Sequence, residues 1–221
     1  KEGGMLFKYA TTVYNKDSSI LMRILKFLLN KDNYERAQRR KGAGLTDNDV
    51  VQFCELDGLL LLALQRIDFT RFFSTRYNEY ISRKFQRKIA KYAIANQVDA
   101  VISYDTNSKI LFNILKDKAP NIKLIMDNAH PNRHFLYHSY HENWDCVGDF
   151  KRTFEACGYL TDEKGSEKFG DEAKLADFHI VASSYSLKAL VYDNIPLENI
   201  YRIPYGVDKN KFLVPKRVYD G

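Results

Sequence analysis

The chain has 221 residues, of which 45% are hydrophobic and 14% aromatic, and its formal net charge is +6. This composition is typical of a globular protein and excludes a disordered chain. No apolar run approaches the roughly 20 residues that cross a bilayer. Three widely spaced cysteines without a Cys-x-x-Cys pair argue against a disulfide framework and fit a reducing cytosol. The basic charge fits nucleic acid, an anionic membrane or phosphate-bearing substrates, and does not choose among them.

The first helices and strands are predicted from local composition and from the glycine and capping residues that mark their ends. Gly3-Gly4 is typical of the end of a helix, whose body would lie upstream of Lys1. An aromatic and β-branched strand is expected over 5–14, and Asp17-Ser18-Ser19 can cap a helix that runs to Leu29. Further elements expected along this part are a basic loop over 36–46, a short strand over 50–54 and a buried helix over 59–67.

The clearest helix is predicted over 77–97, because apolar residues recur every fourth position from Tyr77 to Ala93. Beyond it, strands and helices alternate with short connections, apart from an irregular region rich in His and Tyr. The expected strands span 100–104, 122–126, 178–182 and 199–203, and the expected helices span 108–116 and 185–192. Such alternation predicts an α/β fold: a Rossmann-like parallel sheet with helices on both faces.

Two strand-to-helix junctions are the first candidate binding elements. Ligands of open parallel sheets sit at the carboxyl ends of strands, where helix N-termini present free amides to anions. Asp105-Thr106-Asn107-Ser108 is one such junction, and Ser183-Ser184-Tyr185 is another. Ser183 or Ser184 can cap the following helix and still face a ligand. The alternative is that both junctions only cap helices.

The closing stretch of the chain resembles family 4 of the glycosyltransferases. The resemblance rests on Glu172 to Ser183, Ile195 to Ile200, and Ile203-Pro204-Tyr205-Gly206-Val207-Asp208, and it covers about 40 residues in the order of that family. Family members have the GT-B fold, two facing Rossmann-like domains with the active site between them. The resemblance implies that 1–203 is the N-terminal, acceptor-side domain and that 204–221 is the linker into a C-terminal, donor-binding domain.

This resemblance implies a function, and the sequence departs from the family pattern in two ways. The family's first strand with its glycine turn, and its C-terminal domain, are not found in the residues given. The expected activity is that of a retaining hexosyltransferase, which moves a sugar from a nucleotide-sugar donor to a glycan or lipid-linked acceptor in cell-surface or exopolysaccharide biosynthesis. No cofactor or metal is expected, and the donor would be held mainly by the C-terminal domain. We therefore expect the chain alone to be inactive, and the enzyme to be cytoplasmic and peripheral at the inner face of the plasma membrane.

His130 is the leading candidate catalytic residue. It follows a predicted strand in the run Met126-Asp127-Asn128-Ala129-His130-Pro131, and in related enzymes a histidine here borders the sugar and the acceptor. The alternative is that His130 only caps a turn. Residues expected to contact substrate are Asp105, Thr106, Asp127, Asn128, Ser183, Ser184, Tyr185, Tyr205 and Gly206.

His134, His138 and His141 are candidate metal ligands, because their spacing would place them on one helix face. No carboxylate or cysteine completes an obvious set of ligands in the sequence, so no metal residue is assigned.

The main alternative function is a non-catalytic basic module. The helix over 77–97 could lie on an anionic membrane, or it could cover a sheet and expose a solvated charged face. Its candidate membrane contacts are Arg83, Lys84, Arg87, Lys88 and Lys91. A nucleic-acid-binding module would need salt-sensitive association with DNA or RNA, and no nucleic-acid motif is recognised. A nucleotide-sugar epimerase would need a glycine fingerprint and a Tyr-x-x-x-Lys pair, and we expect that neither occurs in these residues.

Overall fold

The computed structural model describes residues 6–14, 44–146 and 163–206, together with residues 16, 148 and 151. The chain divides into two compact units. The first comprises Lys1–Val101 and Asn107–Ile122, and the second comprises Ile102–Thr106 and Lys123–Gly221.

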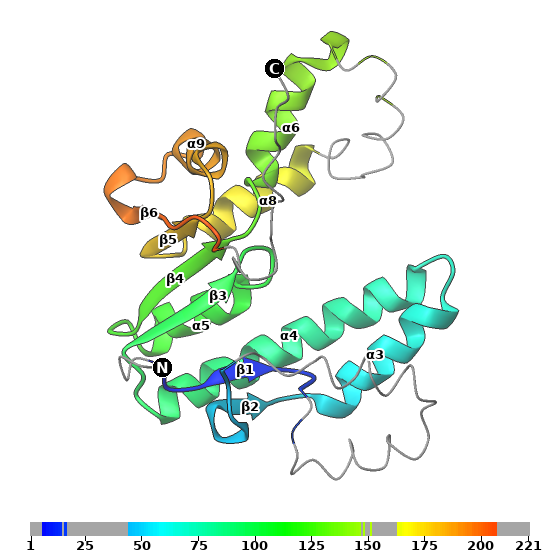
Figure 1. Cartoon of the computed structure of the whole chain (residues 1–221), viewed down its shortest axis with the longest axis vertical. Helices are drawn as coiled ribbons and strands as arrows, with labels where there is room; N and C mark the ends of the chain where they lie inside the picture. The colour runs from blue at the N-terminus through cyan, green and yellow to red at the C-terminus, as the bar shows by residue number, and fades with distance from the viewer. Residues whose placement is uncertain are drawn as a thin grey trace, which may run out of the picture. The chain divides into compact units, whose positions relative to one another are not determined.

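The first unit combines a small parallel sheet with helices (Figure 1). Strand β1 (Tyr9–Thr11) pairs in parallel with β2 (Val50–Gln52), Tyr9 opposite Val50. The approach of α3 to the end of β1 depends on Gly58, because a Cβ there would lie 2.7 Å from Val13 Cγ2. The helices of this unit are α3 (Glu55–Ile67), α4 (Phe72–Ala95) and α5 (Lys109–Lys118), and a 3-10 helix η1 (Asp47–Asp49) precedes β2.

Helix α5 packs on α4, and a buried side chain of α4 satisfies its first amides. Leu111, Phe112 and Leu115 of α5 are at most 1% exposed. The side-chain oxygen of the buried Gln86 accepts hydrogen bonds from the backbone N–H groups of Ile110 at 2.9 Å and Leu111 at 3.1 Å. The N-terminal amides of a helix lack intrahelical partners, so Gln86 fixes where α5 begins.

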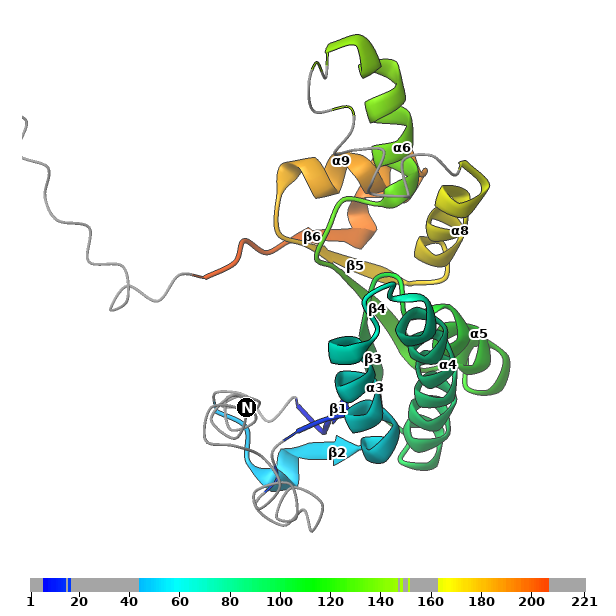
Figure 2. The ribbon, with the colours of Figure 1, turned by 90° about the vertical axis from the view of Figure 1, so that its right-hand side faces the viewer.

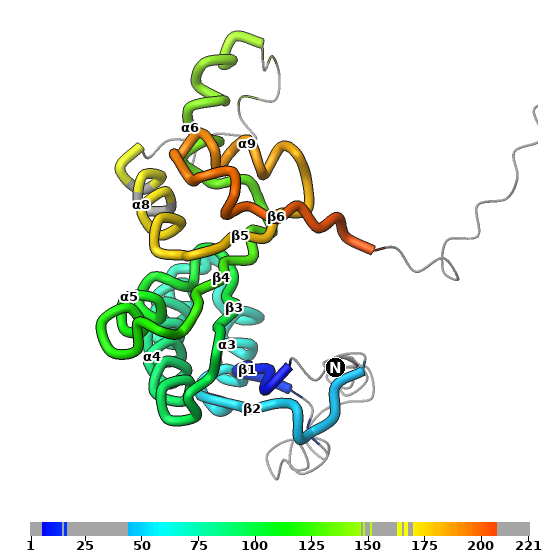
Figure 3. Tube along the Cα trace, turned by 90° about the vertical axis from the view of Figure 1, so that its left-hand side faces the viewer, coloured from blue at the N-terminus to red at the C-terminus, as the bar shows by residue number. Residues whose placement is uncertain are grey.

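A four-stranded sheet runs in the order β3-β4-β5-β6, so that strands adjacent in the sheet are consecutive in the chain (Figure 3). Strands β4 and β5 pair in parallel with Met126 opposite His179, and β5 and β6 pair in parallel with Ile180 opposite Tyr201. Asp177 fastens the start of β5 to β4, because its N–H donates to Leu124 O and its carboxylate accepts from Leu124 N, both at 2.8 Å. The strands are β3 (Ala100–Tyr104), β4 (Lys123–Asn128), β5 (Phe178–Val181) and β6 (Ile200–Arg202).

The helices of the second unit pack on one another beside these strands (Figure 2). Crossovers between neighbouring parallel strands are right-handed, so the connections from β4 to β5 and from β5 to β6 pass over the same face of the sheet. Accordingly Leu124, Met126 and Val181, which share that face, are at most 1% exposed. On the opposite face Tyr201 is 53% exposed. The helices are α6 (Arg133–Glu142), α8 (Glu163–Ala173) and α9 (Ser184–Tyr192), with short 3-10 helices η2 (Trp144–Cys146) and η4 (Leu197–Asn199).

The predicted α/β fold with parallel strands is confirmed, and it is consistent with a Rossmann-like arrangement. The long basic helix is confirmed, although it begins five residues earlier, at Phe72. The prediction of an irregular His- and Tyr-rich region was wrong, because Asn132 caps a regular helix there, and α8 was missed. The helix expected over 59–67 was not fully buried as predicted, since within α3 only Gly58 is buried. The expected helix end at Gly3-Gly4 and the expected helix from Asp17 to Leu29 lie outside the described residues.

Candidate functional site

A shallow pocket opens at the carboxyl ends of β3 and β4, in the second unit. About 260 Å³ of empty space lies within it when the part open to solvent is counted, so the space that the pocket encloses is smaller. Three of the residues predicted from sequence line it, namely Asp105, Thr106 and Asn128. The other lining residues are Met126, Asn132, Arg133, Glu172 and Ala173.

Charged groups of both signs surround Asp105. Burial raises the pKa of the Asp105 carboxyl above its ordinary value, while His130 and Arg133 oppose that rise and the neighbouring Asp127 adds to it. The backbone N–H of Asp105 donates to Asp127 O at 3.1 Å, which joins the ends of β3 and β4. The pocket lining therefore combines a partly desolvated carboxyl with the Arg133 guanidinium, donors and acceptors suited to sugar hydroxyls or phosphate. The His130 imidazole lies near Asp105 but is not among the lining residues.

Asp127 and Asn128 are consecutive in β4 and therefore point to opposite faces of the sheet. Asn128 lies on the buried face, where its amide nitrogen donates to Met126 O at 3.0 Å and Ile180 O at 3.3 Å. The same nitrogen lies 3.2 Å from Nδ1 of His179, which is fully buried and whose pKa is lowered by burial to about 4. The side-chain amide nitrogen of Asn128 thus links β4 to β5. Burial alone raises the pKa of Asp127, which is half-buried.

His130 lies in the connection from β4 to α6, and three polar or charged residues of the pocket, Asn132, Arg133 and Glu172, were not predicted from the sequence. His130 is exposed, and it lies close enough to Asp105 to influence its pKa. Asn132 begins α6, its side chain accepting a hydrogen bond from His134 N at 3.0 Å. Arg133 follows in the first turn, and the buried Glu172 enters the pocket from α8. Asn132 is an N-cap residue, a helix-start signal that could have located α6 and Arg133, whereas no local signal marks Glu172.

The junction after β5 contributes mainly to the start of α9. Ser183 caps that helix, its hydroxyl accepting from Ser186 N at 3.0 Å. Ser184 and Tyr185 are exposed, and the Tyr185 ring meets Phe135 edge-on at 5.4 Å. Beyond β6, Tyr205 is 67% exposed and Gly206 is also exposed. These five predicted residues, Ser183, Ser184, Tyr185, Tyr205 and Gly206, do not line the pocket.

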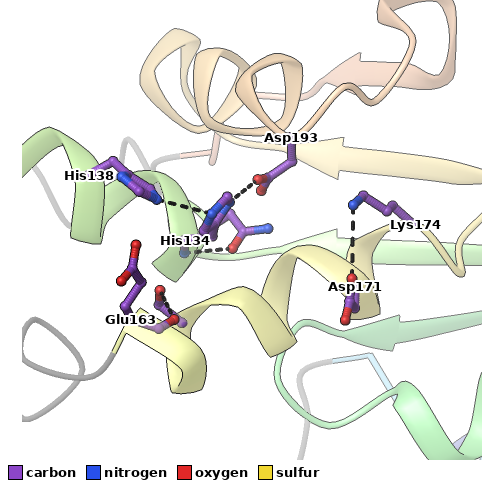
Figure 4. A network of polar contacts seen from close by, with 8 residues as sticks. His134, His138, Glu163, Asp171, Lys174 and Asp193 are labelled. Carbon is purple, nitrogen blue, oxygen red and sulfur yellow. Dashed lines mark hydrogen bonds and ion pairs between the residues drawn. The ribbon is translucent and has the colours of Figure 1, made fainter.

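Three side chains, His134, His138 and Asp193, tie α6 to the end of α9, as Figure 4 shows. His134 Nδ1 lies 2.5 Å from Asp193 Oδ1, and His134 Nε2 lies 3.2 Å from His138 Nε2. Burial raises the pKa of Asp193, and the contact with His134 opposes that rise. Gly170 of α8 allows the approach, because a Cβ there would lie 3.3 Å from Asp193 Oδ1. His141 instead stacks on Trp144 at 5.7 Å, so the three histidines do not converge. Within the described part of the chain, no three His, Cys, Asp or Glu side chains are arranged to hold a metal ion.

The basic face of α4 is exposed at Arg83, Arg87, Lys88 and Lys91. Lys84 differs, because its ammonium forms an ion pair with Asp57 at 2.7 Å. Tyr80 and Lys84 do have the Tyr-x-x-x-Lys spacing, so the statement that no such pair occurs was wrong. In the structure, the Lys84 ammonium lies 5.8 Å from the Tyr80 ring centre, and neither residue lines the pocket.

Comparison with known proteins gives no assignment. No family model, curated protein or solved structure matches the chain. The assignment of function therefore rests on the residues and on the geometry of the pocket. Of the helices in the described ranges, none combines the length and the apolar character needed to cross a membrane.

Proposed function

We propose that this chain is the acceptor-side domain of a retaining glycosyltransferase that uses a nucleotide sugar. One observation carries the proposal: polar and charged groups gather at the carboxyl ends of β3 and β4, where His130 and Arg133 approach Asp105. Ligands of open parallel sheets bind at this edge. The resemblance of the closing stretch to family 4 of the glycosyltransferases supplies the reaction class.

The proposed reaction joins an acceptor hydroxyl to the anomeric carbon as the bond from that carbon to the donor diphosphate breaks. The hydroxyl proton passes to the leaving phosphate, so the enzyme's main tasks are positioning and stabilisation of charge. His130 would hydrogen-bond a hydroxyl of the transferred sugar or of the acceptor. Asp105 and Thr106 would orient the acceptor, which is a glycan or a lipid-linked sugar. The proposal assigns no metal or cofactor, because basic residues of a donor-binding domain would meet the diphosphate.

The small volume of the pocket agrees with a site completed by a second domain. The donor would be held mainly outside residues 1–221, and Tyr205 and Gly206 would lie on the path toward the donor domain. The proposed enzyme works in cell-surface polysaccharide assembly, in the cytoplasm, at the inner face of the plasma membrane.

The test is a nucleotide-release assay with a panel of nucleotide sugars on the enzyme that contains both domains. We expect His130→Ala to lower kcat/KM by about tenfold or more, the usual effect of losing one transition-state contact. His141→Ala, which removes an exposed histidine from the same helix region, is the matched control and should leave kcat/KM unchanged. Unchanged kinetics in His130→Ala would remove this residue from the site, and turnover by residues 1–221 alone would refute the two-domain proposal.

A further inference from the structure

The turn between α3 and α4 exposes four large apolar side chains within seven residues. Phe69 is 96% exposed, Ile67 70%, Phe73 66% and Phe72 51%. We call Ile67, Phe69, Phe72 and Phe73 the aromatic turn. Single exposed apolar residues are ordinary, but a contiguous group of this kind marks an interaction surface.

The aromatic turn is held in a defined shape. The Asp68 carboxylate accepts hydrogen bonds from Ser74 N at 2.7 Å and from Thr70 Oγ1 at 2.9 Å. These bonds lower the pKa of Asp68, and the bond from Ser74 N satisfies one amide in the first turn of α4. Arg71 adopts a left-handed backbone conformation, with φ of 58°, which costs energy in a residue other than glycine. Its carbonyl accepts from Thr75 N at 3.0 Å, so the reversal of the chain is hydrogen-bonded on both sides.

The surroundings of the aromatic turn are cationic. Arg66, Arg71 and Arg76 are exposed beside it, and the Arg76 guanidinium lies 4.4 Å from the Phe72 ring centre. The one carboxylate between residues 66 and 76 is Asp68, and it is engaged within the turn. A partner for this surface must therefore accept apolar rings and supply negative charge.

The turn is also the outer end of a helix pair. Helix α3 has 13 residues and is therefore about 20 Å long, which separates the turn from β2 by that length. Leu56 and Leu60, 64% and 59% exposed, continue an apolar stripe along α3 toward Ile67. Figure 1 shows that α3 and α4 run antiparallel to each other and are joined by this turn.

We propose that the aromatic turn docks into the surface of a bilayer that contains anionic phospholipid. Phenylalanine and isoleucine would enter the boundary between headgroups and acyl chains, and the arginines would contact the phosphates. A soluble protein partner would need an apolar groove lined with acidic residues. An anionic bilayer presents apolar acyl chains and negatively charged phosphates over its whole surface. This inference moves the expected membrane contact from the charged face of α4 to the end of the α3–α4 pair. This inference rests on the proposed function in one respect only, namely that the acceptor is lipid-linked and lies at a membrane.

The test is flotation of residues 1–221 with vesicles of phosphatidylcholine alone and of phosphatidylcholine mixed with phosphatidylglycerol. We expect binding to the mixed vesicles that weakens as salt rises, because exposed charges are screened. The variant Phe69→Ala/Phe73→Ala should lower the partition coefficient by tenfold or more. The matched control Val191→Ala/Leu197→Ala removes exposed apolar side chains from the second unit and should bind as the parent chain does.

A second variant separates charge from folding. Arg71→Gly removes one cation at a position whose positive φ suits glycine, so it should keep the fold, confirmed by circular dichroism, and weaken binding only to the mixed vesicles. Absence of binding to either vesicle, equal loss in the control variant, or full binding by the Phe69→Ala/Phe73→Ala variant would each overturn the proposal. Transfer to a water-soluble acceptor, measured on the enzyme with both domains, reports on the proposed function separately.

Discussion

Helices α5 and α9 each begin just after a strand of the same sheet, yet their first amides are satisfied in different ways. At α9 the cap is local, because Ser183 precedes the helix and accepts from Ser186 N. At α5 the cap is remote, because Gln86 of α4 accepts from Ile110 N and Leu111 N. Two junctions that appear equivalent in the sequence are therefore different in the folded chain.

The difference bears on where a ligand can bind. The N-terminal amides of α5 that Gln86 occupies are not available to an anion, and the hydroxyl of Ser183 is already engaged in its cap. The pocket instead lies against the β3 and β4 ends, where Asp105, Thr106 and Arg133 meet. Helix starts thus supply the frame of this site, and the loop residues between strand and helix supply its chemistry.

Among the variants that test the difference between the two helix caps, Gln86→Leu is expected to lose the most stability. This change leaves two buried N–H groups of α5 without their acceptor, at about 1–3 kcal/mol each, so we expect a loss of about 4 kcal/mol. Urea denaturation followed by circular dichroism measures it. Gln86→Glu, which keeps an acceptor oxygen, should lose less, and equal losses in the two variants would show that the cap is not the cause.

A smaller effect is expected on the β5 side, from His179. Its folded pKa is about 4 against an ordinary 6.5, so the unfolded chain binds the proton more readily. The contribution of neutral His179 to the free energy of unfolding is therefore retained above pH 6.5 and lost as the pH falls toward 4. The loss is about 3 kcal/mol, because each pKa unit corresponds to about 1.4 kcal/mol.

Urea denaturation at pH 7, 5.5 and 4 measures this acid dependence. The parent chain should lose more stability on acidification than His179→Gln. The carboxyl groups with raised pKa, Asp105, Asp127 and Asp193, act in the opposite direction but are common to both proteins. Parallel pH curves for the two proteins would contradict this account.

The smallest effect is expected from the local cap. Ser183→Ala removes one exposed N-cap hydroxyl and should cost about 1 kcal/mol. Ser183→Asp retains an acceptor and should restore most of that loss. If Ser183→Ala cost as much as Gln86→Leu, the contrast between the local and the remote cap would fail.

Several parts of the fold were predictable because their signals are local. The alternation of apolar runs predicted β3, β4, β5 and β6 to within two residues at each end, and the apolar period predicted α4. Helix α6 was missed because its histidines and tyrosines give a weak apolar period, although Asn132 carries a cap signal. Of the candidate site residues, Asp105, Thr106 and Asn128 line one pocket; they lie at strand ends, which can be read from sequence.

The sequence by itself determined the α/β class, the strands β3 to β6 and the presence of a serine cap before α9, since each follows from neighbouring residues. Only the tertiary structure decided that Gln86 caps α5, that Asn128 faces the interior while Asp127 does not, and that Glu172 enters the pocket from α8. It also decided that Phe69 and Phe73 are exposed beside arginines. These features join residues far apart in the chain or depend on what covers them, and no local pattern encodes either.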